Sequence, residues 1–258
     1  MLSLNSKTAV VSGGSSGIGF ASVLHLLELG HRVAFFGQSS EHVEAACEQI
    51  SQRHSAKFFL GRTVDMLEEG SIRRFFDEAV CSLGNPEILV CSAGISPKGP
   101  QGAALPLTEL TLHEWDSVIA VNLTGAMLCC QLTLPYMQQA CFGRIIFIGS
   151  VAGRTIPIIA GGAYAASKAG LSGLARSLIG QYSRFGVTIN VVAPGRIVTQ
   201  MAGDIDSPRN QAALTRIPVG RLGTVSDVAN AVGFLVSEQS GFINGAILDV
   251  NGGEFAPV

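Results

Sequence analysis

The chain has 258 residues, of which 47% are hydrophobic and 14% are charged, and its net charge is −2. Charged residues usually make up about a quarter of a soluble domain, so this chain is expected to bury much of its surface. The charge balance provides no basic field for nucleic acid, and no uninterrupted apolar run reaches the roughly 18 residues that span a bilayer. We therefore expect a large core and contacts between subunits, with neither a nucleic-acid partner nor a membrane.

The six cysteines form no CxxC pair and no Cys/His cluster, so no metal site is expected. Most of them lie in apolar stretches, where a free cysteine behaves as a small hydrophobic residue. The N-terminal sequence MLSLNSK lacks the charged and then apolar layout of a signal peptide. These features predict a protein of the reducing cytoplasm.

Short β-rich runs alternate with longer helical patterns along the chain. In order, we predict a strand at 7–13, a helix at 19–30, a strand at 31–37, a helix at 40–53, a strand at 57–65, a helix at 68–83, a strand at 86–94, a Pro/Gly-rich loop at 95–107, a helix at 111–138, a strand at 144–150, a helix that contains Tyr164 and Lys168, a strand at 186–195, a helix at 224–237 and a strand at 245–253. Alternating apolar strands and helices are typical of a parallel sheet covered on both faces. No repeat or linker divides the chain, which predicts one doubly wound α/β domain over residues 1–258 with about seven strands.

The turn SGGSSGIG at 12–19 joins the first predicted strand to the first helix. Its glycines permit a tight turn and a close approach of the backbone to a pyrophosphate at the helix N-terminus. A glycine-rich turn can also be purely steric, but its position in the first βαβ unit favours nucleotide binding.

The segment GGAYAASKAG at 161–170 places Tyr164 and Lys168 four residues apart, on one face of a helix whose other residues are small. The two side chains could form a buried hydrogen-bonded pair. Alternatively, the phenol is an acid whose pKa is lowered by the neighbouring ammonium. The segment alone leaves both interpretations open.

Four motifs together resemble the short-chain dehydrogenase/reductase family over nearly the whole chain. They are the GxxxGxG turn at Gly13, Gly17 and Gly19, the Tyr-x-x-x-Lys pair, Ser150 at the end of the fifth strand, and Asn122 in VNLTG. The segment at 217–253 is most similar to the 3-oxoacyl-acyl-carrier-protein reductase-like members. The resemblance implies a Rossmann-type fold and an NAD(P)-dependent oxidoreductase that exchanges hydride between nicotinamide and a carbonyl or alcohol carbon.

The resemblance also implies the catalytic roles. Tyr164 is the acid/base, Ser150 donates a hydrogen bond to the substrate oxygen, and Lys168 binds the nicotinamide ribose. Asn122 holds its helix open for a water molecule that links Lys168 to solvent. We expect Lys168 to lower the pKa of Tyr164.

The expected cofactor contacts follow the family's motifs in chain order. They are Gly13, Ser15, Ser16, Gly17, Ile18, Gly19, Gln38, Ser39, Asp65, Met66, Ser92, Ala93, Gly94, Tyr164, Lys168, Pro194, Gly195, Ile197 and Thr199. The sequence departs from the family at CSAG (91–94), where Asn-Asn-Ala-Gly is usual. The loss of two amides predicts a local adjustment and retained binding.

The position at the end of the second strand, where an acidic residue selects NAD(H), is Gly37. Nothing there excludes a 2′-phosphate, although the arginines common in NADP-binding members are replaced by Ser16 and Gln38. Ser15, Gln38, Ser39 and Ser40 could still donate hydrogen bonds to a phosphate. We predict NADP(H) rather than NAD(H).

The predicted substrate pocket consists of Ser96, Ala152, Ile156, Ile158, Arg196 and Met201, with a lid at about 197–216. Arg154 and Arg196 could meet a carboxylate or phosphate, or could face solvent. The uncharged turn MQQACFG at 137–143 offers little to an acidic carrier protein, which favours a smaller alcohol or ketone. A 3-oxoacyl-carrier-protein or CoA reductase is the alternative.

The helices at 117–130 and 170–182 are apolar on more than one face, which predicts a homotetramer or homodimer. An alternative from another class is a catalytically silent nucleotide-binding regulatory protein. Such a protein could have lost the lysine or the serine, and this chain retains both.

Overall fold

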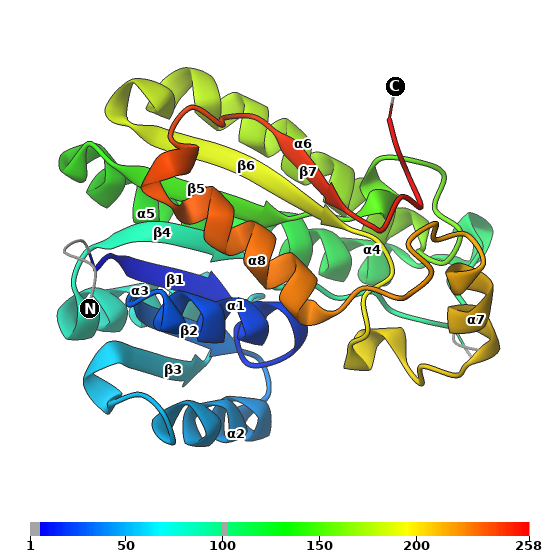
Figure 1. The fold of residues 1–258 in the computed structure, drawn as a ribbon, viewed down its shortest axis with the longest axis horizontal. Helices are drawn as coiled ribbons and strands as arrows, with labels where there is room; N and C mark the ends of the chain where they lie inside the picture. The colour runs from blue at the N-terminus through cyan, green and yellow to red at the C-terminus, as the bar shows by residue number, and fades with distance from the viewer. Residues whose placement is uncertain (1–5, 100–102, 258) are drawn as a thin grey trace.

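The computed structural model describes residues 6–99 and 103–257, so positions 1–5 of the N-terminal sequence MLSLNSK and positions 100–102 of the predicted loop lie outside it. Seven parallel strands form one sheet in the order β3-β2-β1-β4-β5-β6-β7 (Figure 1). The strands are β1 (Thr8–Ser12), β2 (Arg32–Gly37), β3 (Phe59–Thr63), β4 (Pro86–Cys91), β5 (Gly143–Ile148), β6 (Val187–Pro194) and β7 (Ile247–Val250). The predicted doubly wound α/β fold is confirmed.

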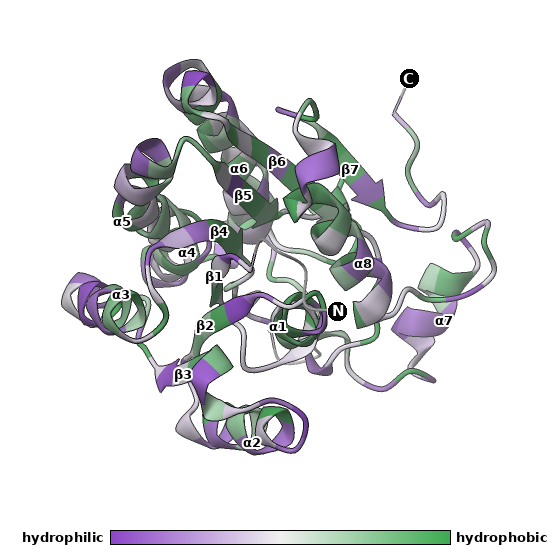
Figure 2. Cartoon of the chain, turned by 60° about the vertical axis from the view of Figure 1, so that its left-hand side comes forward, coloured by the Kyte–Doolittle hydropathy of each residue, from purple (hydrophilic) through white to green (hydrophobic). Residues whose placement is uncertain are grey.

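Helices cover both faces of the sheet. The α-helices are α1 (Gly17–Glu28), α2 (Ser40–Ser51), α3 (Glu69–Leu83), α4 (Leu112–Ile119), α5 (Gly125–Ala140), α6 (Gly162–Tyr182), α7 (Pro208–Leu214) and α8 (Val225–Val236). Single 3₁₀ turns are η1 (Ala56–Phe58), η2 (Leu107–Glu109), η4 (Val151–Gly153), η5 (Ser183–Phe185), η6 (Gln200–Ala202) and η7 (Glu238–Ser240). Figure 2 shows the hydrophilic side of α3 turned outward and its hydrophobic side turned toward the sheet.

Alternate residues of each strand point to opposite faces, so the sheet carries two hydrophobic cores. Ala9 and Val11 of β1 pack with residues of α1, α2 and α8. Val10, between them, packs with residues of α3, α5 and α6 on the other face. This arrangement explains why the strands are continuous apolar runs in the sequence.

The order of the strands reverses at β1, which pairs with β2 on one side and with β4 on the other. The chain therefore leaves the carboxyl ends of β1 and β4 toward opposite faces of the sheet. This divergence opens a crevice at the place where doubly wound folds bind their ligands.

The predicted helix at 111–138 is a longer continuous helical stretch that contains one wide turn. Between α4 and α5, the segment η3 (Ala120–Thr124) is π-helical. Contrary to the sequence-based expectation about apolar runs, the stretch Leu112–Ala140 is long and apolar enough to cross a membrane by length and composition. However, Cys129, Leu134 and Met137 on this helix are buried in the core against the sheet, as in the core helix of a globular domain.

Candidate functional site

Two neighbouring cavities, which share lining residues, lie at the carboxyl ends of the strands. The larger one has a volume of about 570 Å³ and the smaller one about 410 Å³. Gly13, Ser16, Ala93 and Gly94 line both cavities, so they form the ridge between them. The two cavities together offer an elongated site whose middle part is lined by the glycine-rich turn.

The glycine-rich turn requires glycine for two physical reasons. Gly13 (φ 66°) and Gly17 (φ 54°) adopt left-handed backbone conformations that other residues rarely tolerate. A Cβ atom at Gly13 would also lie only 2.7 Å from the Cα of Ala93. The turn is therefore packed directly against the segment after β4, which leaves its backbone open to the cavities.

Ser12, a residue that the sequence analysis did not single out, braces the CSAG segment. Its hydroxyl oxygen accepts hydrogen bonds from the backbone N–H groups of Ser92 and Ala93, both at 3.2 Å. Cys91 is buried, and its thiol lies near Cys129 and Cys130 of α5. The expected local adjustment thus consists of a serine bridge across the sheet and a thiol in the core.

The smaller cavity is lined by the residues expected around adenosine. Ser15, Gln38, Ser39, Asp65 and Met66 all lie on its wall, and His42 of α2 lies there as well. His42 was missed because it follows the second strand by five residues, on a helix that looks ordinary in the sequence. Its backbone N–H donates to the Ser39 hydroxyl, which caps α2.

Gly37 cannot carry a side chain in this structure. A Cβ atom there would overlap the Ser15 hydroxyl and would lie 2.8 Å from the Ser15 Cβ. The side chain of Ser15 therefore occupies the space where an acidic residue at the end of β2 would begin.

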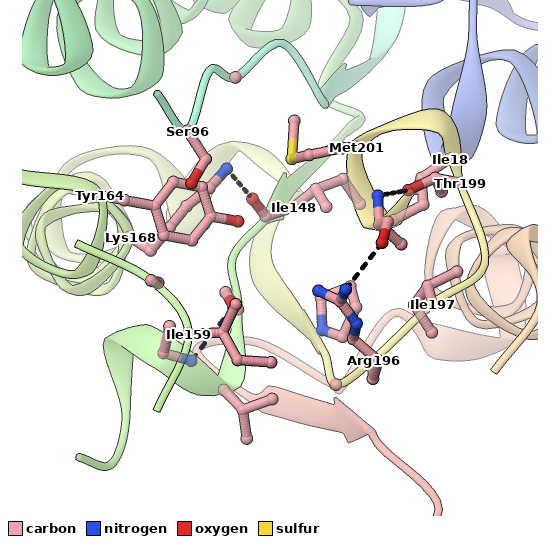
Figure 3. A pocket seen from close by; sticks show the side chains of 18 of the residues that line it. Ile18, Ser96, Ile148, Ile159, Tyr164, Lys168, Arg196, Ile197, Thr199 and Met201 are labelled. Carbon is pink, nitrogen blue, oxygen red and sulfur yellow. Dashed lines mark hydrogen bonds between the residues drawn. The ribbon is translucent and has the colours of Figure 1, made fainter. Parts of the chain in front are cut away.

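Ser150, Tyr164 and Lys168 converge on the larger cavity (Figure 3). Ser150 follows β5, and its hydroxyl oxygen accepts from the N–H of Ala152 at 3.1 Å. Tyr164 and Lys168 project from the first turns of α6, and the Lys168 Nζ donates to the backbone oxygen of Ile148 at 2.8 Å. The same Nζ lies 5.6 Å from the centre of the Tyr164 ring.

Burial controls the acidity of both groups on α6. It raises the pKa of Tyr164, and a hydrogen bond with Ser150 opposes this shift. It lowers the pKa of Lys168 to about 8. The structure thus differs from the expectation that Lys168 sets the pKa of Tyr164 below its usual value, because desolvation of the phenol raises this pKa and outweighs the hydrogen bond with Ser150.

Asn122 lies behind the cavities, in the π-helical segment, and is buried. Its side-chain oxygen accepts from the N–H of Ile95 at 2.8 Å, and its NH₂ group donates to the Ile95 oxygen and to the Ser167 hydroxyl, each at 3.0 Å. Asn122 therefore ties the loop after β4 to the helix that carries Tyr164 and Lys168. The water that it was expected to hold stays a prediction.

The remaining sequence-predicted residues line the larger cavity. They are Ile18, Gly19, Pro194, Gly195, Ile197 and Thr199 for the cofactor, and Ser96, Ala152, Ile156, Ile158, Arg196 and Met201 for the substrate. The mouth of the cavity is apolar, since Ile156, Ile158 and Met201 are largely exposed there. Lys98, Arg216, Glu254 and Phe255, which the sequence analysis missed, complete this part of the wall.

Arg154 does not line either cavity. It forms an ion pair with Asp249 of β7, and its guanidinium lies 5.2 Å from the centre of the Phe255 ring. Arg154 is thus partly buried, and the carboxylate that it meets is that of Asp249 in the same chain, next to the C-terminal segment.

Comparisons with known proteins agree with this arrangement. The family model described as enoyl-(acyl carrier protein) reductase matches residues 13–254. The chain is 38% identical over 248 residues to the 3-oxoacyl-[acyl-carrier-protein] reductase MabA of Mycobacterium tuberculosis (strain ATCC 25618 / H37Rv), covering 96% of this chain and 92% of the relative. It is 35% identical over 250 residues to the reductase FabG of Staphylococcus aureus (strain N315), covering 96% and 98%.

Solved structures show the same similarity in three dimensions. A 3-oxoacyl-[acyl-carrier protein] reductase with bound NAD from Brucella melitensis superposes with a TM-score of 0.90 at 28% identity, covering 98% of this chain and 93% of that one. A short-chain dehydrogenase/reductase from Serratia marcescens gives a TM-score of 0.89 at 31% identity, covering 98% and 99%. The chain therefore belongs to the short-chain dehydrogenase/reductase family, and it is an oxidoreductase that exchanges hydride between a nicotinamide cofactor and a carbonyl or alcohol carbon.

Proposed function

We propose that the protein reduces a small ketone with NADPH, and reversibly oxidises the corresponding secondary alcohol, with Tyr164 as the acid/base. The observation that carries this proposal is the convergence of Ser150, Tyr164 and Lys168 on a cavity that the glycine-rich turn also lines. A nicotinamide cofactor supplies or accepts the hydride when it is bound.

The residues of the crevice fit a dinucleotide. Gly13 packs so closely that a Cβ atom there would lie 2.7 Å from the Ala93 Cα, and a Cβ atom at Gly94 would lie 3.3 Å from the Lys168 Nζ. Such close approach of bare backbone suits a pyrophosphate and a ribose. The Lys168 Nζ, which lies beside Gly94, is the group that would hold the nicotinamide ribose near the Tyr164 hydroxyl.

Tyr164 is suited to donate a proton in the reductive direction. Its raised pKa keeps the phenol protonated at neutral pH, and its side chain lines the same cavity as the Ser150 hydroxyl. As a carbonyl oxygen gains negative charge, the hydroxyl groups of Ser150 and Tyr164 can both donate to it, and Tyr164 then transfers its proton. In the oxidative direction, Tyr164 would take this proton back.

The preference for NADPH rests on the neutral end of β2. The packing of Ser15 against Gly37 leaves no room for a carboxylate that would repel a 2′-phosphate. Around this position, the side chains of Gln38, Ser39 and His42 line the cavity and offer polar groups to a phosphate.

Two substrate classes remain in competition. The relatives named above act on 3-oxoacyl groups carried by acyl carrier protein, which makes a 3-oxoacyl thioester the second candidate. Against it, the segment 137–143 carries no charged residue for docking an acidic carrier, and the Arg184 guanidinium lies 4.7 Å from the centre of the Phe185 ring. A small ketone needs no such docking surface.

Three further features belong to the proposal. The segment 197–216 acts as a substrate lid, which is supported by the position of η6 and α7 at the cavity and by the hydrogen bonds of Arg196 to Ala202 and Asn210.

The chain forms a homotetramer or homodimer, which is supported by the exposed apolar side chains of Leu112 and Phe242. The protein works in the cytoplasm.

The decisive experiment combines cofactor binding with turnover. The purified protein is titrated with NADPH and NADH, and consumption of the preferred cofactor is followed with a neutral ketone and with S-acetoacetyl-N-acetylcysteamine. We expect tighter binding of NADPH and turnover of the ketone. Binding without turnover of any carbonyl would instead support the catalytically silent alternative, and turnover of the thioester alone would support the acyl-reductase class.

A further inference from the structure

Two cations stand at the substrate end of the larger cavity. Lys98, in the loop after β4, and Arg196, directly after β6, both line the same cavity as Tyr164. The Lys98 Nζ lies 3.0 Å from the hydroxyl oxygen of Ser96, which lines the same cavity as Tyr164 (Figure 3). In the same view, Arg196 lies across the opening from Tyr164.

The contacts of both cations are to neutral oxygen atoms. Lys98 donates to the Ser96 hydroxyl and, at 3.5 Å, to the Ile159 backbone oxygen. Arg196 donates to the side-chain oxygen of Asn210 at 2.6 Å and to the Ala202 backbone oxygen at 2.8 Å. Within residues 6–99 and 103–257, no carboxylate lies at ion-pair distance from either cation. Each therefore keeps N–H donors and a full charge that the described residues do not neutralise.

The other charged groups of this wall already have partners or roles. Glu254 is the one acidic residue among the described residues that line the larger cavity. Its Oε1 accepts from the Nε and Nη2 atoms of Arg216, at 3.2 and 3.0 Å. Lys168 is bound to Ile148 beside Tyr164. The uncompensated charge at the substrate end therefore belongs to Lys98 and Arg196.

The pKa shifts of Lys98 and Arg196 agree with this distribution of charge. The pKa of Lys98 is lowered first by its partial burial and then by the positive charges of Arg196 and Arg209. The pKa of Arg196 is lowered by burial and by Arg209, while Glu254 acts in the opposite direction. An anion between these groups would relieve their mutual repulsion and regain a charge-assisted hydrogen bond from each.

We propose that the substrate carries an anionic oxygen group, a carboxylate or a phosphate, which Lys98 and Arg196 bind while the carbonyl oxygen lies at Tyr164. This inference rests on the proposed function, because it assigns a substrate class to the same cavity. The sequence offered both Arg154 and Arg196 as possible ligands of a carboxylate or phosphate. The proposal assigns this role to Arg196, since Arg154 is neutralised by Asp249 and Arg196 is not.

The test compares an anionic carbonyl substrate with its neutral methyl ester. With NADPH, kcat/KM is measured for acetoacetate and for methyl acetoacetate, using the wild type, Lys98→Gln and Lys98→Glu. We expect the wild type to prefer the anion, Lys98→Gln to reduce this preference about tenfold, and Lys98→Glu to reduce it further. The neutral ester is the internal reference for each variant, so the quantity compared is the ratio of the two kcat/KM values. The matched control is Lys57→Gln, a lysine outside both cavities whose Nζ lies 5.0 Å from the centre of the Phe58 ring.

A second pair identifies the source of the anion. S-acetoacetyl-phosphopantetheine is compared with S-acetoacetyl-pantetheine, so that only the phosphate differs. A preference for the phosphorylated thioester that disappears in Lys98→Gln assigns the site to a phosphate, and the same result with acetoacetate assigns it to a carboxylate. Either result supports the proposal.

A binding measurement keeps this inference separate from the proposed function. Stabilisation of the protein by butanoate and by butanamide is followed by thermal unfolding, with no turnover involved. We expect butanoate to bind more tightly and Lys98→Gln to abolish the difference. If the wild type turns over neutral ketones but shows no preference for an anion in any of these pairs, the inference is overturned while the proposed function stands. If no carbonyl is reduced but butanoate binding depends on Lys98, the proposed function fails and the anion site remains.

Discussion

Because Gly37 packs against Ser15, substitutions at these two positions should reverse the preference for NADPH over NADH. Gly37→Asp alone should impair binding of both cofactors, because the new Cβ atom would lie 2.8 Å from the Ser15 Cβ. In the double variant Gly37→Asp with Ser15→Gly, the serine side chain is gone and the carboxylate has room. We expect this double variant to bind NADH in preference to NADPH.

The expected magnitude follows from two electrostatic effects. A carboxylate about 5 Å from a 2′-phosphate repels it by roughly 3 kcal/mol per unit of phosphate charge at an effective dielectric constant near 20. That repulsion corresponds to a loss of about a hundredfold or more in NADPH affinity, since each 1.4 kcal/mol is tenfold. In NADH, the same carboxylate accepts hydrogen bonds from the ribose hydroxyls, each contributing about 1.5–3 kcal/mol.

The assay is fluorescence titration of each variant with both cofactors, with Ser15→Gly as the control. That single variant should retain the wild-type preference, because removing the serine adds no charge. The reasoning is refuted if Gly37→Asp alone binds NADH as tightly as the double variant does. It is also refuted if the wild type already binds NADH more tightly than NADPH.

Three other predictions concern the catalytic end of the crevice. Tyr164→Phe should lower kcat by about 10²–10⁴-fold while NADPH affinity is retained, because only the proton donor is removed; an unchanged kcat in steady-state assays would contradict this role. The affinity for NADPH should fall as the pH rises through about 8, because Lys168 is positively charged below its lowered pKa and neutral above it; titrations across this range should show the change, and Lys168→Ala should not. Asn122→Ala should destabilise the fold by roughly 2–4 kcal/mol, because it leaves the partly buried backbone groups of Ile95 and the buried Ser167 hydroxyl without this partner; denaturant unfolding measures this, and a loss below 1 kcal/mol would mean that water replaces the side chain.

The fold was predictable because its strands are buried on both sides. A run such as AVV in β1 must be apolar throughout when both faces are covered, and that pattern is visible without any knowledge of the partners. The boundaries of the elements were less accurate. The last residues of the predicted strand at 86–94 leave the sheet after Cys91, where the chain turns into the cavity. The wide turn at Ala120–Thr124 gives no signal in the hydrophobic pattern.

The site was predictable where a motif fixes position along the chain. The glycine turn follows β1, Ser150 follows β5 and the pair lies at the start of α6, so the parallel topology brings all of them to the carboxyl edge of the sheet. Residues whose role depends on contacts across the fold were missed or misjudged. Nothing in the sequence near Arg154 reveals Asp249, 95 residues later, and nothing near Lys98 reveals that Arg196 will lie on the same cavity.

The wide turn that holds Asn122 has a consequence for how this helix can change over evolutionary time. A π-helical turn contains one more residue than an α-helical turn, and each residue rotates a helix by about 100°. Deleting a single residue from 120–124 would therefore restore an ideal helix, but it would also swing α4 around its axis relative to α5. The side chains of one half would then point away from the surfaces on which they now pack. The length of this short segment is thus coupled to the shape of the whole stretch from Leu112 to Ala140, so insertions and deletions should be tolerated in the loops at either end and not within it.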